Sequence, residues 1–68
     1  MSDDANKVLV HIWSNYRAGD LVNIGELARA LGWTINRTHV ATYELLQSKW
    51  AVATPNRKAI ALSAEVAT

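Results

Sequence analysis

The chain has 68 residues and no cysteine, so it can form one domain with a thin core, and disulfides, thiolate metal sites and cysteine nucleophiles are excluded. Half of its residues are hydrophobic, 19% are charged and the net charge is +1, which is typical of a compact folded domain and gives a nucleic-acid partner only weak support. No apolar run approaches the roughly 20 residues of a membrane span, and the acidic start is unlike a signal peptide, so we expect a cytoplasmic protein.

The first predicted helix begins after a cap at Ser2 or Asp3 and ends in the turn at residues 18–20. Gly19 in that turn can adopt the left-handed conformation that often follows a last helical turn. His11 is expected to be solvent-facing or partly covered rather than a ligand. The stripe expected to face the core has helical spacing and consists of Val8, Leu9, Ile12, Trp13 and Tyr16.

The second predicted helix spans residues 24–31. Asn23 can cap it, with Glu26 three positions later as the partner in a capping box. Gly32 ends it. Its buried face consists of Leu27, Ala28 and Leu31.

Two short segments flank this helix. Leu21 and Val22 are expected to form a short third strand beside a later hairpin. Trp33, in the turn after the helix, is expected to fill the gap between helices, with stacking on a nucleic-acid base as the alternative.

The third predicted helix covers residues 34–49, and Thr34 caps it. Advancing about 100° per residue predicts a core-facing arc of Ile35, Thr38, His39, Thr42, Tyr43, Leu45, Leu46 and Trp50. The opposite arc, open to water or a ligand, consists of Asn36, Arg37, Val40, Ala41, Glu44, Gln47 and Ser48. His39 and Tyr43 lie near the boundary, so each is either a packing or a contact residue. Two helices joined by a short turn that contains Gly predict a helix-turn-helix.

A β-hairpin is predicted next, with strands at residues 50–52 and 59–62. The connecting segment at 54–58 contains the turn formers Pro55 and Asn56. Residues 63–68 have no strong pattern and are expected to fray or to form a short helix for self-association. The sequence therefore predicts one α+β domain over residues 1–68, with three helices followed by a two-stranded hairpin, a core at 3–62 and a tail at 63–68.

These elements resemble the winged helix-turn-helix transcriptional regulators over residues 21–62. The resemblance is carried by Glu26-Leu27-Ala28, Leu31-Gly32, the Thr34 cap, Leu45 or Leu46, and Trp50 to Val52. Lys49-Trp50 stands where many members carry a Gly. A narrower similarity, to the Z-form nucleic-acid-binding winged domains, lies in Ile35-Asn36-Arg37 and Thr54-Pro55, but Val40 stands one turn after Asn36 and the hairpin tip has no Trp.

The resemblance implies sequence-specific binding of double-stranded DNA, with the third helix in the major groove and the wing on the backbone or in the minor groove. Arg37 suits guanine, Asn36 adenine and Val40 a thymine methyl. Phosphate contacts are expected from the remaining predicted site residues, Thr34, Thr38, Arg57 and Lys58. Four of these residues also have a structural alternative. Arg37 would be solvated surface, Asn36 would be a residue tolerated in the first helical turn, and Arg57 and Lys58 would be charges that keep an exposed hairpin soluble.

Charge distribution favours this interpretation more than net charge does. Residues 1–33 carry three bases and four acids, whereas residues 34–58 carry four bases and one acid, Glu44. Glu44 would repel phosphate, so we expect DNA contacts in the first two turns of the helix. The competing hypothesis is a winged helix that binds protein without DNA, favoured by the low net charge and by Trp13, Trp33 and Trp50.

No Gly-rich phosphate loop, carboxylate pair or Ser-His-Asp spacing is present, so we expect no enzyme, and no cofactor, metal or small-molecule ligand is predicted. A lone domain with few phosphate contacts binds DNA weakly, so a homodimer over half-sites about 34 Å apart is expected. The first helix or the tail from Ser63 would supply its interface.

Overall fold

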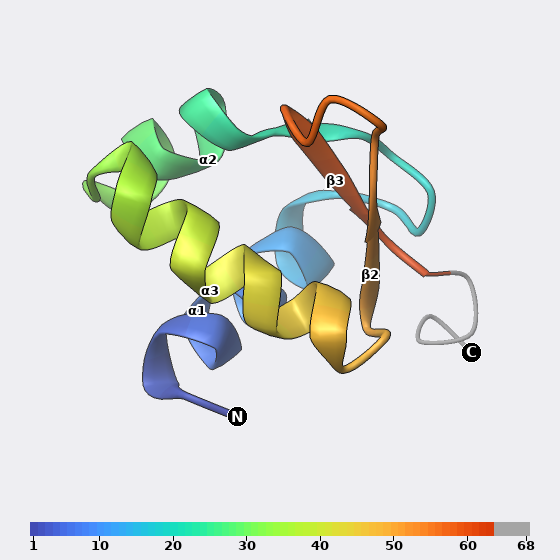
Figure 1. Ribbon diagram of the computed structural model, residues 1–68, viewed down its shortest axis with the longest axis horizontal. Helices are drawn as coiled ribbons and strands as arrows, with labels where there is room; N and C mark the ends of the chain where they lie inside the picture. The colour runs from blue at the N-terminus through green and yellow to red at the C-terminus, as the bar shows by residue number, and fades with distance from the viewer. Residues whose placement is uncertain (64–68) are drawn as a thin grey trace.

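The structure, a computed structural model that describes residues 1–63, is an α+β fold with three helices and a three-stranded antiparallel sheet. The helices are α1 (Asp3–Asn15), α2 (Ile24–Leu31) and α3 (Ile35–Gln47), and the strands are β1 (Val22–Asn23), β2 (Ala51–Ala53) and β3 (Ala59–Leu62). In the view of Figure 1, α3 crosses the front of the molecule and the hairpin of β2 and β3 lies to its right. The predicted helices and hairpin are confirmed as elements, and so is a third strand, but α3 ends two residues before the predicted end at 49 and β2 lies one residue later than the predicted strand at 50–52.

Each helix begins at the predicted cap. In every case the side-chain oxygen of the cap accepts the backbone N–H of the residue three positions later, and the caps are Ser2, Asn23 and Thr34. Gly32 ends α2 in the left-handed conformation, with φ +70°. The end of α1 comes earlier than predicted, because Tyr16 is already extended, and Gly19 (φ +88°) lies in the following loop.

The sheet has the strand order β1-β3-β2, so β3 is central. Val22 pairs with Ile60 in β3, whereas Leu21 is 64% exposed, so the short strand lies one residue later than predicted. The Ile24 N–H donates to the Lys58 carbonyl at 2.8 Å, which ties the start of α2 to the hairpin loop. These bonds fix the hairpin beside α2 and α3.

The core is formed by one face of each helix and by the sheet. In α1 the buried side chains are Ala5, Val8, Leu9 and Ile12, and Tyr16 packs against them at the edge. Trp13 was expected in this stripe, but it is 54% exposed, so that prediction is wrong. Ala5, which was not in the predicted stripe, is fully buried. In α2 the predicted face is confirmed for Leu27 and Ala28, and Leu31 packs at the edge of the core.

The buried face of α3 differs from the predicted one. The side chains that it buries are Thr38, Ala41, Thr42 and Leu45. At about 100° per residue, the centre of this set is rotated by roughly 70° from the centre of the predicted arc. Ile35, expected inside, is 55% exposed, whereas Ala41, expected outside, is only 2% exposed. Tyr43, for which packing and contact had both been left open, is 53% exposed. The rotation turns the Arg37 side of the helix toward α1, which packs against α3.

The junction between α3 and β2 contains Lys49, whose φ is +62°. This left-handed backbone conformation costs a residue that has a side chain about 1 kcal/mol or more. The turn is closed by the Trp50 N–H, which donates to the Leu45 carbonyl at 3.0 Å. Lys49 therefore has a backbone conformation that Gly adopts without steric cost.

Lys49→Gly should raise the free energy of unfolding by about 0.5–1 kcal/mol, because Gly adopts this φ without steric cost, offset in part by the greater entropy of the unfolded chain. Urea denaturation measures the change. Ser48→Gly is the matched control: Ser48 has φ −85°, so Gly there should lower the stability. A loss of stability in Lys49→Gly would contradict the conclusion that the backbone at Lys49 is strained.

Candidate functional site

The side of α3 that faces away from the core is exposed, and we call it the outward face. Val40 is 72% exposed, and Asn36 beside it is exposed. Three further side chains on this face are also open to solvent: Ile35, which was expected in the core, and His39 and Tyr43, for which packing and contact had both been left open. The face is therefore broader and more apolar than predicted.

Arg37 lies at the edge of this face and is held in place. Its Nε and Nη2 atoms each donate to a carboxylate oxygen of Asp4 at 2.9 Å, and its guanidinium carbon lies 4.2 Å from the centroid of the Trp33 ring. The hydrogen bond holds the pKa of the Asp4 carboxyl below its ordinary value of 3.8, and it raises the pKa of Arg37. Arg37 is exposed and Asp4 is partly exposed, so solvent screens the pair and Arg37 can exchange Asp4 for another anion at little cost.

Because the pKa of Asp4 is lowered, Asp4 holds Arg37 over a defined pH range. A carboxyl whose pKa is lowered by folding stabilises the folded state above its ordinary pKa, and that contribution is lost as the pH falls through the folded value. Asp4 therefore stays ionised, and stays paired with Arg37, at neutral and mildly acidic pH.

The two threonines of the predicted site have different positions. Thr34 is exposed, and its hydroxyl oxygen accepts the N–H of Arg37 as the cap of α3. Thr38 is fully buried, and its hydroxyl donates to the Thr34 carbonyl at 2.9 Å. Thr38 is thus removed from the set of residues that can meet a phosphate, because its side chain lies in the core between α3 and its neighbours.

The loop between β2 and β3 presents Arg57 and Lys58, both exposed. Asn56 organises this loop: its side-chain oxygen accepts hydrogen bonds from the Thr54 hydroxyl at 2.7 Å and from the Lys58 N–H at 3.0 Å. Arg57 follows in a left-handed conformation, with φ +58°. The loop is a fixed support for two cations and not an open chain.

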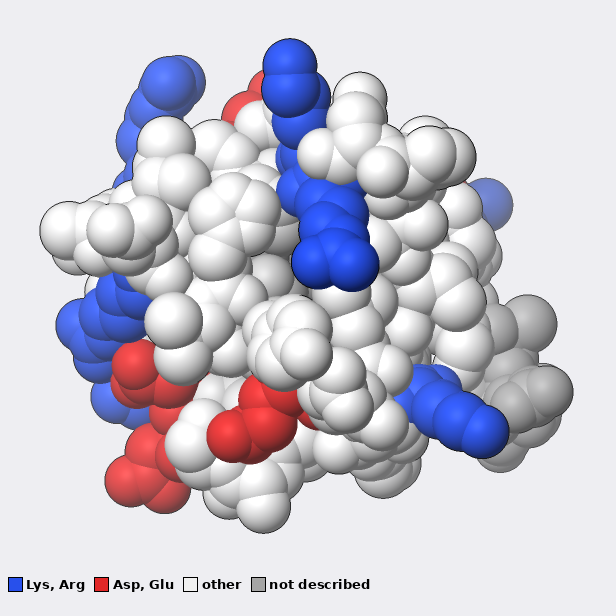
Figure 2. Space-filling view, viewed as in Figure 1, with Lys and Arg blue, Asp and Glu red and all other residues white. Residues whose placement is uncertain are grey.

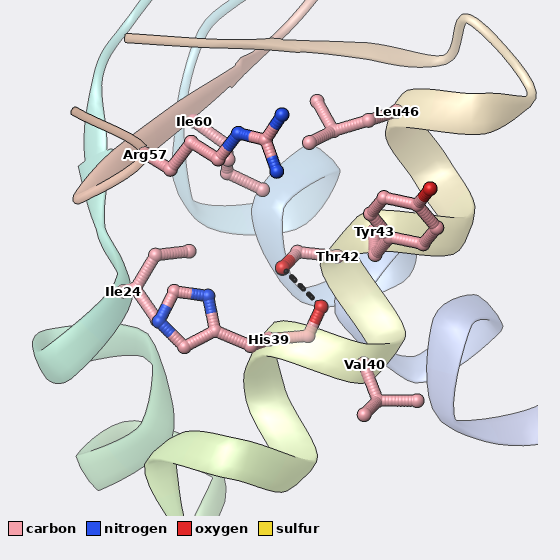
Figure 3. Close-up of a pocket in the computed structure, with 8 residues that line it drawn as sticks. All are labelled: Ile24, His39, Val40, Thr42, Tyr43, Leu46, Arg57 and Ile60. Carbon is pink, nitrogen blue, oxygen red and sulfur yellow. Dashed lines mark hydrogen bonds between the residues drawn. The ribbon is translucent and has the colours of Figure 1, made fainter. Parts of the chain in front are cut away.

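A hollow of about 310 Å³ separates α3 from this loop (Figure 3). Val40 and Tyr43 of α3 line it together with Arg57, so helix and loop contribute to one surface. Lys58 lies beside Ile35 and His39 in a neighbouring, smaller hollow. The structure therefore brings together the exposed half of α3 and both cations of the loop, which are far apart in the sequence.

The charge on this face is uneven. Figure 2 shows the face largely uncharged, with basic side chains at its upper centre, along its left edge and at its lower right, and acidic ones mainly toward the lower left and lower centre. Glu44 is half-buried, and its carboxylate accepts the Ser2 N–H at 2.6 Å. Its oxygen is directed to α1 rather than to the centre of the face, which weakens the repulsion that its charge would exert on an anion.

The contacts of Arg37 were not indicated by the sequence. Asp4 and Arg37 are 33 positions apart, and no periodic pattern connects them. The one signal for Tyr43 and His39 was their place near the edge of the predicted arc.

Within residues 1–63, no helix has the length and apolar character needed to cross a membrane. In the same part of the chain, no three His, Asp or Glu side chains come together in a way that could hold a metal ion. Comparison of the chain with protein-family models, curated proteins and solved structures gave no match.

Proposed function

We propose that this protein is a winged helix-turn-helix regulator that binds double-stranded DNA with α3 in the major groove and the β2–β3 loop as the wing. The observation that carries the proposal is that Val40 of α3 and Arg57 of the loop line one surface, with Lys58 and the amino end of α3 next to it. The short turn at residues 32–34 between α2 and α3 is typical of a helix-turn-helix.

The residues on this surface suit both kinds of DNA contact. Asn36 can form two hydrogen bonds with adenine, and Val40 can contact a thymine methyl. Arg57 and Lys58 suit phosphates on the backbone or a minor groove, and Thr34 suits a phosphate at the amino end of α3. Base contacts would supply specificity, and phosphate contacts would supply most of the affinity.

The proposed regulator acts as a homodimer. Val10 and Trp13 on α1 are 61% and 54% exposed, and neither belongs to the proposed DNA surface. An interface on α1 would leave α3 open and would allow two copies to occupy half-sites about 34 Å apart.

A salt titration of random duplex DNA tests the proposal. Contacts from Arg57, Lys58 and the amino end of α3 predict that log K falls against log salt with a slope of about −3. Fluorescence anisotropy measures the affinity between about 50 and 200 mM salt. In parallel, amide shifts in NMR spectra should cluster at Asn36, Val40 and Arg57. Absence of binding at the lowest salt would contradict DNA as the partner.

A second candidate function is binding of a protein partner through the same face. Ile35, Val40 and Tyr43 are each more than half exposed, and a set of apolar side chains on one helix face is typical of a protein interface. Under this alternative the chain would not bind duplex DNA at any salt concentration.

Asp4→Asn should raise the affinity for random DNA severalfold, because it removes a negative charge and releases Arg37 for a phosphate. The salt slope should become steeper by about 0.9, the contribution of one further phosphate contact. Thermal unfolding should change little, because the pair is exposed.

Asp3→Asn is the matched control for Asp4→Asn. It removes the same charge from the neighbouring exposed position, whereas the Arg37 contacts are made by Asp4. An equal gain in both variants would show that net charge alone is responsible. No gain in Asp4→Asn would exclude Arg37 from the DNA surface.

A further inference from the structure

The hollow between α3 and the β2–β3 loop has the composition of a ligand site. Its floor is formed by Ile24 and Ile60, which are 3% and 1% exposed, so the hollow reaches the core. Leu46 and Tyr43 form the wall on the α3 side (Figure 3). Its volume of about 310 Å³ lies at the lower end of the range for sites that bind small molecules.

Arg57 is the one residue with a permanent charge among those that line the hollow, and no Asp or Glu lines it. In Figure 3 its guanidinium group extends over the opening from the loop side. Among residues 1–63 the single ion pair is that of Arg37 with Asp4, so Arg57 has no carboxylate partner there. The hollow therefore combines mainly apolar walls, to which His39 and Thr42 add polar groups, with one available cation.

The backbone at Arg57 strengthens this observation. Its φ of +58° is a conformation that Gly or Asn adopts more easily, and Asn56 stands next to it. A long cationic side chain at a strained position beside a hollow is an outlier that points to a function for that side chain.

We propose that this hollow binds a small carboxylic acid with a branched or flat apolar body. The body would contact Leu46, Ile24 and Ile60, and the carboxylate would form a bidentate pair with the Arg57 guanidinium. For a ligand of about eight non-hydrogen atoms in an open hollow, the dissociation constant is expected to be about millimolar.

Such a ligand would compete with DNA, a consequence that rests on the proposed function. Arg57 cannot pair with a carboxylate and a phosphate at once, and a ligand between α3 and the loop would occupy the space beside Val40. Competition is reciprocal, so DNA would weaken the binding of the acid by the same factor.

The direct test uses NMR spectra of the ¹⁵N-labelled full chain during titration with 4-methylpentanoate. Two matched probes separate the contributions: 4-methylpentanamide has the same body without charge, and acetate has the charge without the body. The acid should shift the amides of Tyr43, Leu46 and Arg57, and both other probes should bind about tenfold more weakly. Equal binding of the amide or of acetate, or no shift with the acid, would overturn the proposal.

A variant pair tests the role of Arg57. Arg57→Gln should weaken the binding of 4-methylpentanoate about tenfold and leave that of the amide unchanged. Arg29→Gln removes one exposed cation from α2, outside the hollow, and should bind the acid as the native chain does. Because Arg57 is exposed, the variant is expected to fold, and its amide spectrum verifies this. Native binding of the acid by Arg57→Gln would overturn the assignment.

Competition is measured separately, by the anisotropy of labelled duplex DNA at fixed salt with rising 4-methylpentanoate. Release of DNA by the acid and not by the amide supports a shared site, and unchanged DNA affinity at saturating acid overturns it. A chain that shifts with the acid but never binds DNA would refute the proposed function while the ligand site stands, so the two failures are distinguishable.

Discussion

Leu45→Ala should lower the free energy of unfolding by about 2–5 kcal/mol, the largest effect expected of any single change in this chain. Leu45 is 0% exposed, and it lies where α3 packs against the rest of the core. Removing its branched end leaves a cavity that the neighbouring helices can close only in part. A chain of this length has a total stability of about 3–10 kcal/mol, so the variant is expected to be close to unfolding at room temperature.

Thermal and urea unfolding followed by circular dichroism measure this loss, and each kcal/mol should lower Tm by about 4–8 °C. Val40→Ala is the control, because it shortens an apolar side chain of the same helix that is 72% exposed. It should retain the native stability or gain a few tenths of a kcal/mol from the higher helix propensity of Ala. Equal destabilisation by both changes would contradict the observed orientation of α3.

The local elements could be predicted because their signals lie within a few residues. A cap and the N–H that it accepts are three positions apart, which is why Asn23 and Thr34 were identified correctly and Ser2 was one of the two caps considered for α1. The bounds of α2 follow in the same way from Asn23 and Gly32. The hairpin follows from its turn residues, and its return strand, residues 59–62, was predicted with the observed bounds.

The orientation of α3 could not be predicted from hydrophobicity, because its buried side chains are not its most apolar ones. Thr38 and Thr42 can be buried because each hydroxyl donates to a backbone carbonyl of its own helix. The small side chain of Ala41 can be buried where helices approach closely. Of the larger apolar side chains, Ile35 remains outside although it was expected in the core, and Val40 remains outside as predicted. A pattern based on apolar residues alone therefore places the centre of the buried face about 70° from its actual position.

The same rotation of α3 changes the surroundings of several residues in the candidate site. It directs Arg37 toward Asp4, and it opens His39 and Tyr43 beside the hairpin loop. These relations depend on how α1 and the loop pack around α3, which is tertiary information. The result is a surface whose cations are supplied mainly by the loop, so the loop is the place where a test of DNA binding is most sensitive.

Arg57→Ala combined with Lys58→Ala should weaken binding to all duplex sequences alike, by about 50-fold at 0.1 M salt. Each cation that contacts a phosphate releases about 0.9 counterion, so the slope of log K against log salt should fall in magnitude by about 1.8. Sequence preference should remain, because the base contacts proposed for Asn36 and Val40 are intact. Anisotropy titrations at several salt concentrations, on one preferred and one random duplex, measure all three quantities.

The control must remove two positive charges without touching the proposed surface. Lys7→Ala with Arg17→Ala does so, since both side chains are exposed, on α1 and just after it, and neither lines the hollow beside α3. This pair changes the net charge equally but removes no proposed phosphate contact, so its salt slope should match that of the native chain. If both pairs of substitutions flattened the salt slope equally, DNA binding would depend only on net charge. If only the loop pair flattened the slope and sequence preference were preserved, the loop would supply the phosphate contacts and α3 would supply the base contacts.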